Sequence, residues 1–398
     1  MYRPALLGLL ALLTVPCSAA QMVQPAAESS FVNGVTHFYA PPVGPDFMQN
    51  SMMEGLVDTA MRESDFAYLN RKAQEYRIKQ SRTARGEWTL DLFYDSFVVQ
   101  HSDDPVVADG RYTAYENKVL DWAAKYPNEP APHLVYAERL IRHGWLFRGY
   151  GTAGEVSAEG WTRFHDYIGR AQAYLLAHKA VAGVDPAWYV EMLQVALGND
   201  WSSKDYDTLL SQAEMRFPDY TPIYYAATDH FLPQWGGDVD SLDRFVNDAV
   251  NRTKARSGTQ MYARIYSAVV CDCNFTFADT RADWPRMRAA YDEIAARYPD
   301  PWVFDEQFYV ACMVGDKPTA SRALAKLGDE PRSPVWQAPG TFGACRAWTA
   351  AKDNAPSPLM RRAAAEEPVP AEQSLVEAFV IGCLELLRDF ASVIGGLV

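Results

Sequence analysis

Apolar residues recur at steps of three and four along most of the chain. The clearest run spans residues 157–180, where Trp161, Phe164, Ile168 and Leu175 fall on one face of a helix. Runs of alternating apolar and polar residues, which are typical of half-buried strands, are scarce. The pattern therefore predicts an all-α protein. Further helices are expected at residues 54–81, 87–101, 112–125, 131–144, 186–197, 204–216, 220–231, 239–255, 258–271, 282–298, 304–314 and 317–326.

A recurrent phrase indicates that the helices come in pairs. A basic residue, an aromatic residue and a proline follow one another in Ala124-Lys-Tyr-Pro-Asn-Glu-Pro130, Arg216-Phe-Pro-Asp-Tyr-Thr-Pro222 and Arg297-Tyr-Pro-Asp-Pro301. The cation suits the negative end of a helix, and the proline stops the helix from continuing. Each phrase is therefore interpreted as the joint of a helical hairpin.

These hairpins predict an irregular solenoid of the tetratricopeptide type. One pair of joints is spaced close to the ~34 residues of such a repeat, while the others are spaced irregularly. A single helical pair cannot bury its own apolar face, so the pairs are expected to stack into a curved array with a groove. We assign residues 86–350 to this helical-repeat domain and residues 21–85 to an N-terminal extension with the first helices.

The composition changes after residue 351. Residues 351–371 hold four prolines among alternating charges, which predicts a disordered linker. Residues 372–398 place apolar side chains at a 4-3-4-3-4 spacing and predict an amphipathic C-terminal helix. That helix either folds back onto the array or docks in a partner, and a second copy of the chain is one such partner.

The first twenty residues have the pattern of a secretory signal peptide. A single positive charge at Arg3 precedes a short apolar run, and Ser18 and Ala20 supply the small residues at the cleavage site. We expect cleavage near Ala20 and an exported, soluble product in the periplasm or outside the cell. A lipid anchor on Cys17 is the minor alternative, because Pro16 stands where lipid processing favours a small residue.

The charge balance narrows the range of partners. The chain has 50 acidic and 37 basic residues, a net charge of −13. Such a surface repels phosphate backbones and favours a basic peptide or protein partner, so nucleic acid is not expected. No apolar run after residue 20 is long enough for a transmembrane span.

Cysteine usage suggests a disulfide rather than a metal site. Five cysteines follow residue 20, and Cys312 and Cys345 stand one hairpin length apart, so they could pair across neighbouring repeats. Cys271-Asp-Cys273 has no histidine nearby in sequence, and a zinc site needs four ligands at a regular spacing. We expect neither a metal nor a cofactor.

Motifs of catalysis are weak or incomplete. Gly149-Tyr-Gly151-Thr-Ala-Gly154 matches the dinucleotide fingerprint, but a helix rather than a strand is expected before it. The seven histidines lack the HExxH spacing, and no Gly-x-Ser-x-Gly elbow occurs. No catalytic residue is assigned. In Leu232-Pro-Gln-Trp-Gly-Gly-Asp238, the two glycines end a helix, and Trp235 fills the core beneath the turn or lines a groove.

Two stretches carry a resemblance to a known family. The run Arg142-His-Gly-Trp-Leu-Phe-Arg-Gly-Tyr-Gly-Thr-Ala-Gly-Glu-Val-Ser-Ala-Glu-Gly-Trp161 and the later Leu232-Pro-Gln-Trp-Gly-Gly237 resemble the bacterial family catalogued as domain of unknown function 4034, over residues 90–320. The resemblance implies a helical, tetratricopeptide-like fold and no assigned activity. Gln234 and Asp238 depart from the basic residue and the serine usual in that family. A family-related surface is mapped onto Arg148, Gly149, Glu155, Trp161, Trp235 and Gly236, provided that the two stretches meet in space.

The sequence therefore favours an exported scaffold that binds a protein or peptide. The alternative is an envelope enzyme, hydrolase-like, that uses a pair of carboxylates in a concave pocket lined by aromatic residues. A purely structural array in a larger assembly is a third hypothesis.

Overall fold

The computed structural model describes residues 28–32, 34–39, 44–149, 151–272, 275–333, 335–336 and 338–365. Three predicted features lie outside these residues: the signal peptide at 1–20, the lipid-anchor alternative at Cys17, and the amphipathic helix at 372–398. Cys273 and Cys383 lie outside them as well.

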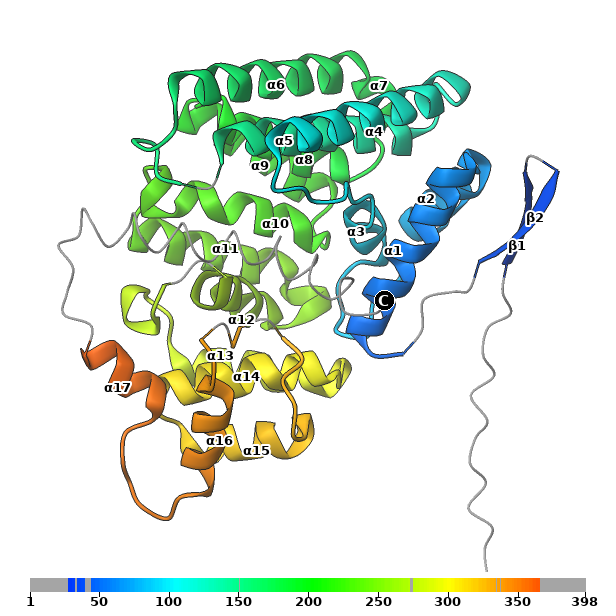
Figure 1. The fold of residues 1–398 in the computed structure, drawn as a ribbon. Coiled ribbons are helices and arrows are strands. Elements are labelled where there is room, and N and C mark those ends of the chain that lie inside the picture. Colours follow the sequence, from blue (N-terminus) through cyan, green and yellow to red (C-terminus); the bar gives the residue numbers. More distant parts are fainter. Residues whose placement is uncertain are drawn as a thin grey trace, which may run out of the picture.

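The described part of the chain is mostly helical, which confirms the all-α prediction (Figure 1). Its α-helices are α1 Asp46–Glu63, α2 Phe66–Lys79, α3 Thr89–Asp95, α4 Pro105–Lys125, α5 Pro130–Arg148, α6 Ala158–Ala177, α7 Lys179–Ala182, α8 Ala187–Gly198, α9 Ser203–Arg216, α10 Thr221–Thr228, α11 Val239–Ser257, α12 Gln260–Ser267, α13 Trp284–Arg297, α14 Pro301–Val314, α15 Lys317–Leu327, α16 Thr341–Ala350 and α17 Pro358–Ala365. Short turns of other helix types are η1 Asp229–Phe231, η2 Pro233–Trp235, η3 Ala268–Asp272 and η4 Phe277–Asp279.

The three predicted joints are helix ends in the structure. α4, α9 and α13 each end at the basic residue of the phrase, and the aromatic residue that follows is the C-cap. The next helix then begins with a proline in its first turn, where the missing N–H leaves no hydrogen bond unmade. We call the loops 126–129, 217–220 and 298–300 the joint row.

Aromatic side chains fill the main hydrophobic core of the helices. Trp122, Trp188, Tyr206, Tyr224 and Tyr262 are all buried in it. Helices pack mainly on their neighbours in sequence, as in the pairs α4 with α5, α5 with α6, α11 with α12 and α14 with α15.

Helices α1 to α3 and the loop between α2 and α3 form what we call the N-terminal layer, residues 46–97. This layer lies against the joint row, on the right in Figure 1. Trp88 donates its indole N–H to the Asp219 carbonyl at 2.6 Å, and the Asp46 N–H donates to Asp300 at 3.0 Å. One layer therefore contacts joints that are about eighty residues apart in sequence.

The prediction of one helix over 54–81 is wrong, because two helices cover this segment. Ser64 adopts a left-handed conformation with φ 59°, which ends α1. Asp65 then accepts a hydrogen bond from the Tyr68 N–H and begins α2.

A two-stranded antiparallel hairpin precedes the helices. Its strands are β1 Glu28–Val32 and β2 Val35–Tyr39, with Val32 paired to Val35. Sequence analysis missed this hairpin, although Asn33-Gly34 between apolar residues is a strong short-range signal for one.

The C-terminal part of the described chain packs around a disulfide. Cys312 of α14 is bonded to Cys345 of α16, the pair named from the sequence. Phe308, Ala320 and Trp348 surround this disulfide in a small second core. The linker prediction is wrong for residues 358–365, since they form α17, which packs on α14 and α16.

Among the described residues, no helix has both the length and the apolar character that a membrane crossing requires.

Candidate functional site

The last residue of α5 is a buried arginine. Gly149 follows it with φ +68° and donates its N–H to the Trp145 carbonyl, which closes the helix. The Arg148 guanidinium donates through one nitrogen, Nη1, to the carbonyls of Gly149 and Gly151, at 3.1 and 3.2 Å. The side chain is placed by the helix end and by the loop that leaves it.

Two indole rings lie against this arginine, and a third packs on one of them. The guanidinium carbon lies 4.9 Å from the centre of the Trp145 ring and 5.0 Å from that of Trp161. The Trp145 ring in turn meets Trp235 edge to face, with 6.2 Å between ring centres. All three indoles are half-buried, and Arg148 is 8% exposed. We call Trp145, Arg148, Trp161 and Trp235 the indole cluster.

The turn that presents Trp235 depends on two glycines. Gly236 has φ +87°, the left-handed conformation that ends η2. At Gly237 a Cβ atom would lie 2.2 Å from the Phe231 carbonyl oxygen, so only glycine fits. Asp238 then caps α11 in a reciprocal capping box with Ser241. The two stretches singled out from the sequence therefore meet in space, through Trp145 and Trp235.

Not every residue of the mapped surface joins the cluster. Glu155 is exposed and folds back on its own loop, where it accepts the Thr152 N–H at 2.8 Å. Gly149 is half-buried beside Arg148, and Gly236 is exposed in the turn after Trp235. Trp145 was absent from the mapped surface, although it contacts both Arg148 and Trp235.

Polar atoms of the cluster are buried without a partner. Among the described residues, Arg148 Nε, Trp235 Nε1 and the neighbouring Gln234 Oε1 have no hydrogen bond. Within the same part of the chain, no carboxylate lies within ion-pair distance of Arg148. Burial lowers the pKa of the Arg148 guanidinium, which nevertheless stays charged at neutral pH. A buried charge of this kind is unfavourable unless an anion accompanies it.

The glycine-rich loop does not have the setting of a dinucleotide site. Helix α5, rather than a strand, precedes Gly149-Tyr-Gly151. The phosphate-binding turn of that motif needs a strand before it, so the loop is a connection between α5 and α6.

A small hollow lies where the end of α5 meets the beginnings of α4 and α6. Its volume is about 250 Å³, and Phe147, Ser157, Gly160, Arg163 and Asp109 are among the residues that line it. Here the charges are paired: Arg163 stacks on Phe147 at 3.5 Å and donates to Asp109 at 3.2 Å.

The same Asp109 also contacts a fully buried histidine. His143 meets Asp109 through Nε2 at 2.9 Å and Glu116 through Nδ1 at 2.7 Å. Sequence analysis missed this trio. Glu116 and His143 lie on α4 and α5, which pack side by side, so only helix pairing could have suggested it.

A second group of ionisable side chains lies where α3, α5 and α8 come together. We call Asp91, Asp95, Glu138 and Glu191 the carboxylate cluster. Glu138 accepts from Arg139 and Arg142, and Arg142 also lies 3.7 Å from Asp95. Glu191 is 6% exposed, and its Oε2 has no hydrogen bond among the described residues.

The surroundings push the pKa values of these carboxyls apart. Burial, with the charge of Glu138, raises the pKa of Glu191 well above its ordinary value. Burial would raise the pKa of Glu138 too, but Arg139 and Arg142 hold it below its ordinary value. A pair of carboxyls whose pKa values are shifted in opposite directions is the arrangement that general acid and base catalysis uses.

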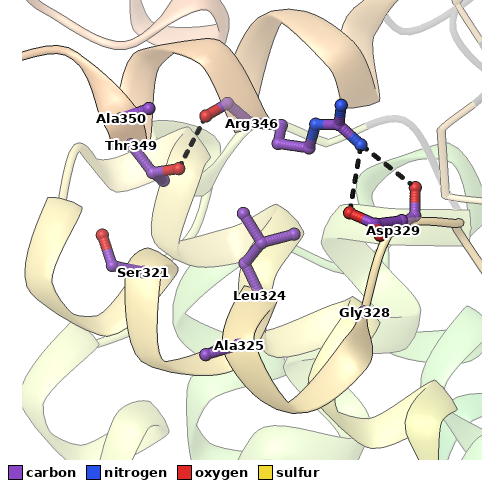
Figure 2. Close-up of a pocket in the computed structure, with 8 residues that line it drawn as sticks. All are labelled: Ser321, Leu324, Ala325, Gly328, Asp329, Arg346, Thr349 and Ala350. Atoms are coloured by element: carbon purple, nitrogen blue, oxygen red, sulfur yellow. Dashed lines mark hydrogen bonds and ion pairs between the residues drawn. The ribbon is translucent and has the colours of Figure 1, made fainter.

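A larger hollow of about 380 Å³ lies between α15 and α16 (Figure 2). Ser321, Leu324 and Ala325 line one wall, and Arg346 reaches across to Asp329, 3.4 Å away. The Arg346 guanidinium in this hollow therefore already has an acidic partner, whereas Arg148 in the indole cluster has none among the described residues.

Comparisons with known proteins identify no relative. No protein-family model, no curated protein and no solved structure matches the chain. In the described part of the chain, no three His, Cys, Asp or Glu side chains are arranged to hold a metal ion.

Proposed function

We propose that this protein is an exported helical-repeat scaffold that binds a peptide or protein at the indole cluster. Its hairpins would stack as an irregular tetratricopeptide-like solenoid, the fold implied by the resemblance to the family of unknown function. Grooves of such arrays bind extended peptides. The Cys312–Cys345 disulfide supports export, since disulfides persist in oxidising compartments.

The observation that carries this proposal is the buried, unsatisfied polar surface of the indole cluster. Two half-buried indoles lie against Arg148 and a third, Trp235, packs on one of them, while N–H groups of Arg148 and Trp235 lack partners in the described chain. Buried polar groups in folded proteins are nearly always hydrogen-bonded. A ligand that supplies acceptors there would satisfy them, and tryptophan and arginine are the residues that dominate binding energies at protein interfaces.

A photo-crosslinker at Ala153 tests the proposal. Ala153 is exposed in the loop beside Trp161, whereas Lys204 is exposed on α9 and serves as the control position. In the cells that make the protein, we expect a partner to be captured at Ala153 and not at Lys204. The capture should be lost when Trp161→Ala and Trp235→Ala are combined.

A matched double variant guards against general loss of structure. Trp201 and Trp284 are also half-buried but lie outside the cluster, so Trp201→Ala with Trp284→Ala should leave the capture unchanged. Equal capture at Ala153 and Lys204, or capture that survives the cluster variant, would refute a binding surface at this place.

A second candidate function is supported by the carboxylate cluster. The raised pKa of Glu191 beside the lowered pKa of Glu138 suits a hydrolase with one acid and one base. The protein would then cleave envelope oligosaccharides or peptides, and Glu191→Gln would abolish the cleavage seen by mass spectrometry. No cleavage across both substrate classes would count against this candidate.

A further inference from the structure

Arg148 differs from the other arginines that stack on aromatic rings nearby. Arg163 over Phe147 is paired with Asp109, and Arg170 over Tyr167 lies 3.8 Å from Asp166. Arg148 has two indoles and no acidic partner in the described chain. It is also far more buried than Arg163 or Arg170, whose side chains are 38% and 43% exposed.

Within the described chain, the Arg148 guanidinium forms hydrogen bonds through Nη1 alone. Nη1 faces the carbonyls of Gly149 and Gly151, which lie at the negative end of α5 and account for the position of the arginine. Nε has no partner in the described chain. The Nε and Nη2 edge is one of the two edges by which arginine binds a carboxylate with two parallel hydrogen bonds.

The side chains of the cluster suit an anion that carries an apolar group. Indole rings lie against the guanidinium from Trp145 and from Trp161. A carboxylate that accepts from the Nε and Nη2 edge would lie in the plane of the guanidinium, and the adjoining part of the ligand would contact the indoles. The Trp235 Nε1 atom supplies a further unused donor.

The net charge of the protein narrows the class of ligand that could bring a carboxylate to Arg148. A net charge of −13 repels a ligand that carries many negative groups. That disfavours acidic polysaccharides and strongly acidic peptides. A peptide whose other residues are neutral or basic still carries one carboxylate, at its C-terminus.

We propose that Arg148 binds the C-terminal carboxylate of a peptide ligand through its Nε and Nη2 edge, with Trp145, Trp161 and Trp235 holding the last side chain. This assignment rests on the proposed scaffold function and adds to it the chemistry of the ligand. It requires no further cofactor and no covalent step.

The test uses the full-length protein labelled with ¹⁵N-arginine, and it follows the Arg148 Nε–H signal by NMR. The probes are N-acetylphenylalanine and its neutral amide, N-acetylphenylalanine amide. We expect the acid to shift this signal saturably and the amide to leave it in place. The signal of Arg163, which already has Asp109, should move with neither probe.

Two variants separate binding from folding. Arg148→Lys keeps the charge but loses the fork, so it should weaken binding of the acid by roughly tenfold or more. Arg163→Lys is the matched control and should bind the acid as the unaltered protein does. If Arg148→Lys fails to fold, the comparison of acid and amide on the unaltered protein still decides the question.

Three results would overturn the assignment. The acid and the amide could bind equally, the acid could leave the Arg148 signal unmoved, or glucuronate could bind more tightly than N-acetylphenylalanine. The last result would make the ligand an acidic sugar. Capture of a partner at Ala153 together with an unmoved Arg148 signal would retain the scaffold function and reject only the carboxylate.

Discussion

The two ends of α10 lie in regions that differ in how their buried charged side chains are paired. At its beginning, Thr221 and Tyr225 contact Glu87 of the N-terminal layer, and Arg264 completes the group with an ion pair to Glu87. Beyond its end, the following turn contributes Trp235 to the indole cluster. In that cluster Arg148 has no acidic partner in the described chain.

This difference separates structural charges from functional ones. Charges of the N-terminal layer join segments that lie far apart in sequence, and Glu87 accepts hydrogen bonds from Thr221, Tyr225 and Arg264. Arg264 also donates to the Arg85 carbonyl, and Arg85 lies 3.2 Å from Asp46. Arg148 instead has no carboxylate partner among the described residues, and a buried cation of this kind is a candidate site for an anion.

The largest expected effect on stability comes from removing the buried ion pair between Arg264 and Glu87. Arg264→Met leaves Glu87 buried without its main cation, so the free energy of unfolding should fall by about 3–5 kcal/mol. Both side chains are about one-tenth exposed, at 9% for Arg264 and 12% for Glu87. Urea unfolding followed by circular dichroism measures the change.

The control for this variant is an exposed pair. Arg62 and Asp58 lie on the surface of α1, at 63% and 65% exposure, and Arg62→Met should change stability by less than about 0.5 kcal/mol. Equal effects of Arg264→Met and Arg62→Met would show that the N-terminal layer does not depend on this ion pair.

The next effect is a pH dependence at the end of α10. Burial raises the pKa of Asp229 from its ordinary value to about 6. The folded protein therefore binds this proton more tightly than the unfolded chain does. The resulting stability is present below pH 4 and is lost as the pH rises through 6, by at most about 1.4 kcal/mol per pH unit.

Asp229→Asn isolates this contribution. The variant should lack that part of the pH slope between pH 4 and 6, as measured by urea unfolding across the range. Burial also raises the pKa of Glu214 to about 7, against the effect of Arg252, so the difference between the two proteins is the quantity to compare. Identical slopes would mean that Asp229 is well hydrated.

Features of the fold that depend on residues close together in sequence could be predicted best. The helices and the joint row follow from local periodicity, from the cation at Arg216 and Arg297, and from prolines at helix starts. The break at Ser64 was missed, because it rests on one left-handed residue inside a continuous apolar period. The β-hairpin was missed despite its Asn33-Gly34 signal.

The candidate site was predictable only in part. Its two stretches could be singled out, but the contact between Trp145 and Trp235 joins the end of α5 to the turn after α10. Sequence spacing does not encode such a contact. That no described carboxylate pairs with Arg148 is likewise a property of the packed chain, since Glu155 is close in sequence but turns toward Thr152.

A smaller effect is expected at the turn that presents Trp235. Gly237→Ala places a Cβ atom against the Phe231 carbonyl, so the turn must shift and the free energy of unfolding should fall by about 1–3 kcal/mol. Binding of N-acetylphenylalanine should weaken as Trp235 moves. Thermal unfolding and the NMR titration measure the two changes.

Gly169→Ala is the matched control for that substitution. Gly169 is exposed on α6 with open space at its Cβ position, so alanine should raise stability by up to about 1 kcal/mol. An unchanged titration in Gly237→Ala would show that Trp235 does not contribute to the site.

The smallest expected change in stability has the opposite sign. It tests whether Arg148 differs from the charges that hold the fold together. Arg148→Met removes a buried charge that has no acidic partner among the described residues and leaves a flexible apolar side chain against two indoles. The free energy of unfolding should stay constant or rise by about 1 kcal/mol, because replacing a buried charge by an apolar group of similar size is often neutral or stabilising. Arg163→Met should instead lower it, since Asp109 loses a partner. A loss in Arg148→Met larger than that in Arg163→Met would place Arg148 among the structural charges. An unchanged or increased stability, together with lost binding of N-acetylphenylalanine, would mean that this arginine is retained for its ligand.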